Sequence, residues 1–184
     1  MVHKITRVVL SSFVFGLMLS SLFVSGCKRP GIGYNQGYEP DQPIPYDHSL
    51  HAGKYAINCQ FCHANVDRAA KASVPSLNIC MNCHINVKVR QDLPEESKER
   101  LKTITQRWRE GKPVEWVKVH MLPDFVKFNH HRHVNVGKSC QECHGPVETM
   151  PVVRQHTDLS MGWCVECHRK PENNASLNCT TCHH

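Results

Sequence analysis

Two segments of the chain have a clear hydrophobic pattern. An uncharged, largely apolar run covers Val8–Val24, and no later apolar run is long enough to span a membrane. Farther along, Leu101, Ile104 and Trp108 recur at helical spacing on one face of a polar segment. The pattern therefore predicts an apolar N-terminal segment and one clear conventional helix, over residues 94–110.

Residues with known positional preferences mark both ends of this helix. Pro94 suits the first helical position, and Glu95 and Glu96 favour the N-terminal turn. Gly111 and Pro113 end the helix. We expect its apolar stripe to pack on a neighbouring part of the molecule, and a docking role is the alternative.

Residues 1–26 are typical of a lipoprotein signal peptide. Lys4 and Arg7 precede the apolar run, and Val24-Ser25-Gly26-Cys27 resembles a bacterial lipobox, in which cleavage before the cysteine leaves its thiol carrying a lipid. We therefore expect lipidation of Cys27 to anchor the mature chain at a membrane. An uncleaved signal anchor is the alternative, because the apolar run is near the minimum length of a transmembrane helix.

The residues after the signal favour a membrane-anchored protein with a tether. We expect the protein to face the periplasm from the inner membrane. The outer membrane is the alternative, because Lys28 is not the Asp that commonly marks inner-membrane retention. Residues 27–45 are rich in Gly and Pro and predict a flexible tether. Packing on a partner subunit through Tyr34 and Tyr38 is the alternative.

The pentapeptide Cys-x-x-Cys-His occurs five times and uses ten of the eleven cysteines. Two thiols three residues apart can each form a thioether to a haem vinyl group, while the adjoining imidazole reaches the iron from one face. Five copies predict five covalently attached haems c. The attaching cysteines are Cys59, Cys62, Cys80, Cys83, Cys140, Cys143, Cys164, Cys167, Cys179 and Cys182, and the proximal iron ligands are His63, His84, His144, His168 and His183.

Two other interpretations of the cysteine pairs are weaker. Structural zinc sites also use such pairs, but they rarely place a histidine directly after the second cysteine in every copy. A thioredoxin-like redox site would be expected once per βαβ unit, and no such unit is visible.

The chain is short for so many cofactors. The mature protein has about 32 residues per haem, which is too few for a conventional apolar core around each one. We therefore expect a mainly α protein with extensive irregular loop and low regular secondary structure, in which the haems form the core.

The net charge gives no support to a nucleic-acid partner. The formal charge of +6 includes Lys4 and Arg7, so the mature chain carries +4. Ten ionised haem propionates would bring the holoprotein to about −6.

An imperfect repeat organises residues 46–184. The pattern aromatic-x-His-x-x-His occurs at residues 46–51 and 128–133, and each copy is followed by two haem motifs. We therefore expect one pentahaem domain made of two dihaem modules, residues 46–92 and 114–170, joined by the helix at 94–110 and followed by a terminal haem motif in residues 171–184.

The repeated histidine pairs are the best candidates for the second axial ligands. Histidines three residues apart on a helical turn can point to different haems. We assign His48 to the first haem, His51 to the second, His130 to the third and His133 to the fourth. For the fifth haem we assign His120, which lies in a mostly apolar segment; His184, Met150 and Met161 are the alternatives. We expect His131 and His156 to be exposed.

The histidine pairs preceding haem motifs are similar to those of class III multihaem cytochromes c. Three strings, 122–130, 140–150 and 161–164, also resemble the pentahaem subunit of alternative complex III, a bacterial quinol:electron-acceptor oxidoreductase. The resemblance implies electron transfer with three partners: a polytopic quinol-binding membrane subunit, a large iron-sulfur subunit and a monohaem cytochrome c. The chain departs from that group in its lipobox-like end and in His131, where a basic residue is usual.

Three functions are compatible with a chain of this kind. The first is an electron carrier without substrate chemistry of its own, within a membrane quinol-oxidising complex. A multihaem reductase of nitrite, sulfite or a metal oxide would need an open iron position, whereas candidate ligands here outnumber the haems. A free-standing membrane-anchored cytochrome shuttle is the third possibility, and the anchor argues against free diffusion.

Overall fold

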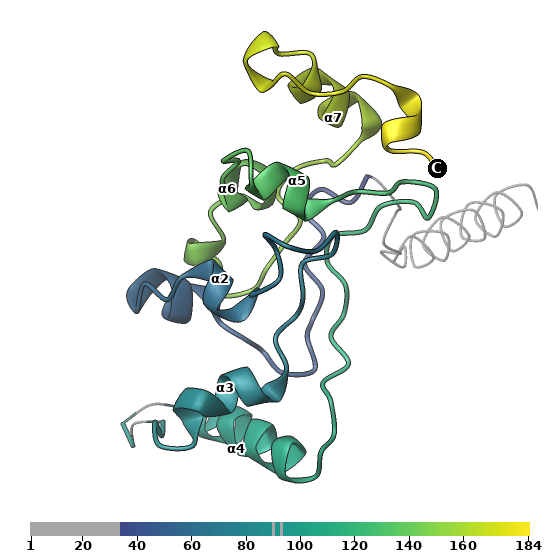
Figure 1. Ribbon diagram of the computed structural model, residues 1–184. Helices are drawn as coiled ribbons and strands as arrows, with labels where there is room; N and C mark the ends of the chain where they lie inside the picture. The colour runs from purple at the N-terminus through teal and green to yellow at the C-terminus, as the bar shows by residue number, and fades with distance from the viewer. Residues whose placement is uncertain (1–33, 90, 93) are drawn as a thin grey trace, which may run out of the picture. The chain divides into compact units, whose positions relative to one another are not determined.

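Short helices joined by long loops make up the part of the chain that the computed structural model describes, residues 34–89, 91–92 and 94–184 (Figure 1). These residues fall within one compact unit, Gly31–His184. They contain no strand. The helical segments are η2 (Ser49–Lys54, a π-helix), α2 (Cys59–Cys62), α3 (Leu77–His84), α4 (Glu95–Arg109), α5 (His130–Val134), α6 (Cys140–His144), η3 (Val147–Thr149), α7 (Met161–His168), η4 (Pro171–Asn173) and η5 (Cys179–Thr181).

Polar side chains cap the starts of three of the helical segments that contain haem motifs, α2, α6 and η5. Asn58 accepts a hydrogen bond from the Gln60 amide at the start of α2 (2.8 Å), and Asn178 does the same for the Thr180 amide in η5 (3.0 Å). At α6 the side chain of Glu142 reaches back to the Ser139 amide (2.8 Å), as in a capping box. Each cap places the first motif cysteine in a helical turn.

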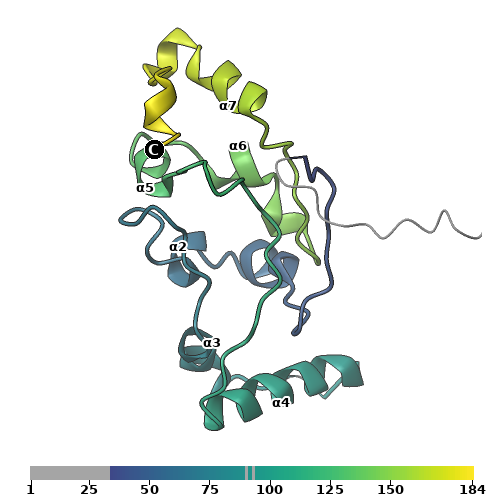
Figure 2. The ribbon, with the colours of Figure 1, turned by 90° about the vertical axis from the view of Figure 1, so that its right-hand side faces the viewer.

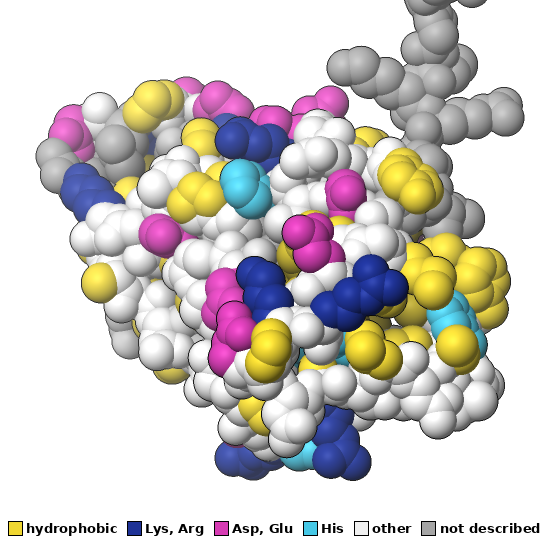
Figure 3. Space-filling view, turned by 90° about the horizontal axis from the view of Figure 1, so that it is seen from above, with side chains coloured by type: hydrophobic (Ala, Val, Ile, Leu, Met, Phe, Trp, Pro, Cys, Tyr) yellow, Lys and Arg dark blue, Asp and Glu magenta, His cyan; other side chains and the backbone are white. Residues whose placement is uncertain are grey.

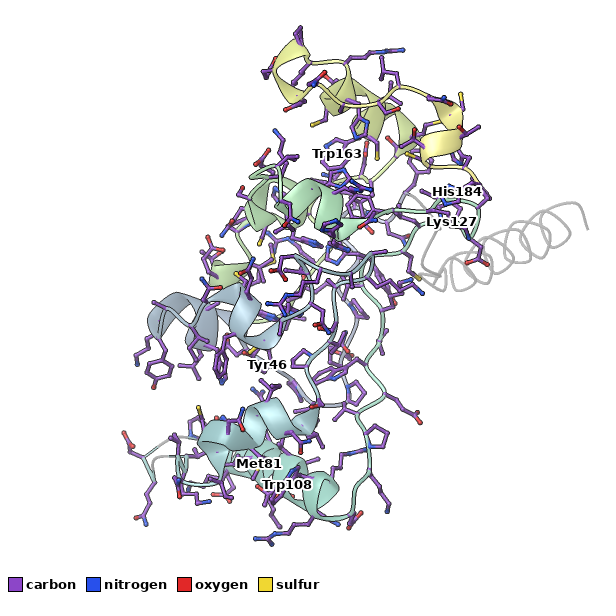
Figure 4. The ribbon with its side chains drawn as sticks, viewed as in Figure 1. Tyr46, Met81, Trp108, Lys127, Trp163 and His184 are labelled. Carbon is purple, nitrogen blue, oxygen red and sulfur yellow. The ribbon has the colours of Figure 1, made fainter. Side chains whose placement is uncertain are left out.

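Helix α4 lies against α3, at one end of the arrangement in Figures 1 and 2. Trp108, labelled in Figure 4, donates its indole N–H to the Asn78 side-chain oxygen (2.9 Å). Pro94 is the N-cap residue rather than the first helical residue, so the helix begins one position later than we expected. No residue of α4 is fully buried, which makes its apolar stripe a partly covered face.

Residues 34–45, the described part of the segment predicted to be a flexible tether, make hydrogen bonds to their own chain. The Gly37 amide donates to the Gln155 carbonyl (2.7 Å), and the Gln155 amide donates to Tyr38 (2.9 Å). Gln42 makes two hydrogen bonds to the backbone of Val117, each 2.9 Å long. Gly and Pro content predicted the lack of helix here but could not reveal these long-range bonds.

The protein part of the core is small. Only Ile44, Val66, Met81 and Met150 are buried hydrophobic residues among those the structure describes. Several large apolar side chains next to the motifs are exposed instead, including Phe61, Ile85, Met161 and Leu177. Figure 3 shows such hydrophobic side chains between charged ones on one face of the molecule. A chain of this kind needs other apolar material to bury these side chains.

The membrane attachment predicted for the N-terminus falls outside the described residues. Residues 1–26 and Cys27 are not among them. In the described ranges, no helix has both the length and the apolar character needed to cross a membrane.

Candidate haem-binding sites

Helical geometry places the three functional side chains of each motif together. Residues i, i+3 and i+4 share one face of a helix, so both cysteines and the following histidine can face the same cofactor. The turn closes through the backbone, as in the bonds from the His63 amide to Cys59 (2.9 Å) and from the His183 amide to Cys179 (3.0 Å). All ten motif cysteines are free thiols, available for thioethers.

Four of the five motif histidines share one hydrogen-bond arrangement. In each, Nδ1 donates to a backbone carbonyl: His63 to Ser73 (2.6 Å), His84 to Val87 (3.2 Å), His168 to Ser176 (2.8 Å) and His183 to Phe125 (3.1 Å). This bond fixes the tautomer with the proton on Nδ1 and leaves Nε2 with a free lone pair. These four imidazoles are therefore ready to bind a metal through Nε2.

The repeated aromatic-x-His-x-x-His pattern is also a structural repeat. Tyr46 stacks on His51 (ring centroids 4.6 Å apart) and meets His48 edge-on (4.7 Å). Phe128 stacks on His133 (4.5 Å) and meets His130 edge-on (4.8 Å). The aromatic ring thus separates the two imidazoles and directs them to different places.

Backbone carbonyls hold three of these four histidines as they hold the motif histidines. Nδ1 of His51 donates to Asp47 (2.9 Å), and Nδ1 of His133 donates to Asn129 (2.8 Å). Nδ1 of His130 lies 3.0 Å from the carbonyl of Ala70, in the loop that follows the first motif, and also accepts from the Ala72 amide (3.3 Å) in its other tautomer. The carbonyl bonds of His51 and His133 leave their Nε2 atoms free for a metal.

Three of these histidines face the motif histidines to which we assigned them. The ring centroids are 6.2 Å apart for His51 and His84, 6.3 Å for His130 and His144, and 5.9 Å for His133 and His168. Imidazole nitrogens bind metals at about 2.0 Å, so two rings on opposite sides of one metal ion have centres about 6 Å apart. The separation within each pair therefore matches that of two imidazoles on opposite sides of one iron.

His48 lies near the remaining motif histidine of the first module, His63. Burial, together with the nearby His63 and His51, lowers the pKa of His48 to about 4. Its buried Nδ1 has no hydrogen-bond partner in the described structure. The arrangement thus keeps His48 neutral at pH 7, as a metal ligand must be.

The described contacts of His120 lie at the third motif and do not include His183, so the assignment of His120 to the fifth haem stays a prediction. His120 instead lies against His144: its Nε2 is 3.3 Å from His144 Nδ1. The ring centroids are 4.4 Å apart, with planes at 85°. The apolar surroundings of His120 predicted burial correctly, but its partner is 24 positions away along the chain and no short-range pattern could reveal it.

The other candidates for the fifth iron position differ in their exposure. Met150 is buried, whereas Met161 and His184 are exposed; His184 is labelled in Figure 4 near Lys127, whose amide bonds to the carbonyl of Cys182 (2.8 Å). His156 is exposed, as expected, but His131 is not. Nδ1 of His131 lies 3.0 Å from the Asp67 carbonyl, a contact that the sequence did not predict.

The motifs do not follow one another in space in sequence order. Burial raises the pKa of Cys80, with the neighbouring Cys62 adding to the rise, which places motifs 80–84 and 59–63 side by side. Burial likewise raises the pKa of Cys140, whose thiol is within hydrogen-bonding reach of Cys59. The first and third motifs are therefore neighbours.

Neighbouring cysteines likewise link the third, fourth and fifth motifs. Burial, together with the nearby Glu142, Cys167 and Cys164, raises the pKa of Cys143 to about 11. Burial also raises the pKa of Cys164, with Cys182 as the largest charge contribution. The spatial series is thus 80–84, 59–63, 140–144, 164–168 and 179–183, which agrees with the succession of α3, α2, α6 and α7 in Figures 1 and 2.

The chain is similar in sequence to known cytochromes c. Residues 126–184 match the family of cytochrome c7 and related cytochromes c. The multihaem cytochrome c fold is confirmed. The chain has a role in electron transport. The cytochrome is also similar to the menaquinone reductase multihaem cytochrome c subunit of Nitratidesulfovibrio vulgaris, with 26% identity over 195 residues that cover 93% of this chain and 88% of that protein.

Proposed function

We propose that this chain is the electron-carrier subunit of a membrane-bound respiratory complex and holds five haems c. The observation that carries the proposal is the set of three histidine pairs with ring centroids 5.9–6.3 Å apart, each joining a motif histidine to a histidine of the repeated pattern. A haem iron held on both faces has no open position for a substrate, and it supplies a one-electron redox couple. This is why we favour a carrier over a reductase.

The proposal assigns each residue one task. Ten motif cysteines attach the haems, and the motif histidines bind the irons from one side. His48, His51, His130 and His133 bind four irons from the other side. The fifth iron takes its second ligand from His184, Met150 or Met161. The exposed apolar side chains around the motifs then cover porphyrin surface, which accounts for the small protein core.

The proposal also places the protein at a membrane. The lipobox-like string ending at Cys27 favours a lipid anchor that faces the periplasm, at the inner membrane rather than the outer one. An anchored carrier stays beside its membrane partners. These are a polytopic quinol-binding subunit, a large iron-sulfur subunit and a monohaem cytochrome c.

Two observations bear on the direction of electron flow. The resemblance to alternative complex III favours oxidation of a quinol. The similarity to the N. vulgaris protein, a menaquinone reductase subunit by name, favours the opposite direction as a second candidate. Both candidates share the same carrier role and differ in which partner supplies the electrons.

Affinity purification from mild detergent tests this function. The tagged chain is expected to copurify with a large iron-sulfur protein and a polytopic membrane protein, and menaquinol added to the assembly should reduce its haems. If the reduced assembly instead passes electrons to menaquinone and menaquinol leaves the haems oxidised, the second direction is correct. Turnover of nitrite or sulfite by the isolated chain would contradict the carrier role, and purification without partners would contradict the complex.

A further inference from the structure

The proximal histidine of the third motif is held differently from the other four. Those four donate from Nδ1 to backbone carbonyls, whereas His144 Nδ1 faces a side chain, Nε2 of His120, at 3.3 Å. Because the iron takes Nε2 of a motif histidine, Nδ1 of His144 keeps its proton and donates it to His120. His120 is then a neutral acceptor.

The surroundings hold this contact in place. The ring planes of His120 and His144 are 85° apart, so the two rings meet edge-on and are not stacked. Both histidines are partly buried. The ring of His130 is parallel to that of His144 within 4°, with the centroids 6.3 Å apart. The segment containing His120 is anchored nearby by the two bonds between Gln42 and Val117.

We infer that His120 is a positioning residue for the haem at motif 140–144: by accepting the hydrogen bond from His144 it orients that ligand and increases its electron donation to the iron. Outer-shell acceptors of this kind raise the basicity of a metal-bound imidazole, and hydrogen bonds around a haem tune its reduction potential. The inference rests on the proposed function, in that it requires a haem at this motif. It predicts a lower potential for this haem than it would have without His120.

Three variants of the full-length holoprotein test the inference. His120→Ala removes the acceptor, while His120→Gln keeps a side-chain oxygen that can accept the same bond. Gln42→Ala is the matched control, because it loosens the same segment without touching His144. Each variant is titrated spectropotentiometrically and examined by electron paramagnetic resonance.

We expect His120→Ala to shift one haem of five to a higher midpoint potential with an altered low-spin signal, and His120→Gln to restore both in part. Gln42→Ala should leave every potential in place. The inference is overturned if no potential moves in His120→Ala, if Gln42→Ala produces the same shift, or if one haem becomes high-spin, which would make His120 an axial ligand.

The wild-type protein separates failure of this inference from failure of the proposed function. Mass analysis of the peptide containing residues 140–144 shows whether a haem is attached there, and the low-spin signal shows whether its iron has two axial ligands. Absence of that haem would overturn both proposals. A bound low-spin haem whose midpoint potential does not change in His120→Ala would overturn only the positioning role.

Discussion

The imidazole rings of His130 and His144 lie parallel within 4°, with their centroids 6.3 Å apart. A metal ion bound to both Nε2 atoms fits between them, since each bond takes about 2.0 Å. His130 comes from α5 and His144 from α6, so the pair also joins the second histidine repeat to the third haem motif.

Replacement of His130 by Ala is expected to convert one haem from low-spin to high-spin, because its iron loses one axial ligand while both thioethers remain. Electron paramagnetic resonance of the oxidised protein measures the change. His131→Ala is the matched control: His131 is the next residue of α5 but contacts Asp67 and faces no motif histidine in the described contacts. An unchanged spin state in His130→Ala would count against the assignment.

These pairs show what short-range sequence patterns can predict. The His-x-x-His spacing places two imidazoles on one helical turn, and a repeated aromatic residue two positions earlier separates them, so His51, His130 and His133 could be matched to motif histidines in advance. The contact of His120 with His144 depends on the path of a long loop. The spatial order of the motifs depends on the approach of Cys59 to Cys140, which no local pattern encodes.

Replacement of Gly53 by Ala should destabilise the protein by about 1–3 kcal/mol, because overpacking a close contact forces the backbone to shift. A Cβ at Gly53 would collide with the carbonyl oxygen of Glu148, where η2 packs on η3. Thermal unfolding of the holoprotein measures the loss.

Gly162→Ala is the control for this prediction. Its Cβ would come no nearer than 3.7 Å, to the Ser160 hydroxyl. The position lies within α7, where Ala in place of Gly contributes roughly 0.5–1 kcal/mol of stability. Equal effects of the two substitutions would refute the close approach of η2 to η3.

Replacement of Trp108 by Phe should lower stability by about 0.5–1.5 kcal/mol, since the ring is kept but the bond to Asn78 is lost. Lys102→Ala, which removes a solvent-exposed ion pair with Glu99, is expected to cost about 0–1 kcal/mol. Denaturant unfolding compares the two. A loss no greater in Trp108→Phe than in Lys102→Ala would show that the indole bond does not tie α4 to α3.

Replacement of Cys27 by Ser should prevent lipidation and release the cytochrome from membranes, because the lipid is the proposed anchor. Fractionation with mass analysis of the N-terminus checks the result. Retention of the variant at the membrane with Met1 still present would favour the uncleaved signal anchor instead.

The intact mass of the purified mature protein tests the central claim most directly. Five complete Cys-x-x-Cys-His motifs predict a polypeptide mass increased by five covalently attached haems, with pyridine haemochrome absorbance giving the same number. Conversion of Cys179 and Cys182 together to Ser should reduce the count by one. A properly matured wild-type chain carrying four haems or fewer would contradict the account.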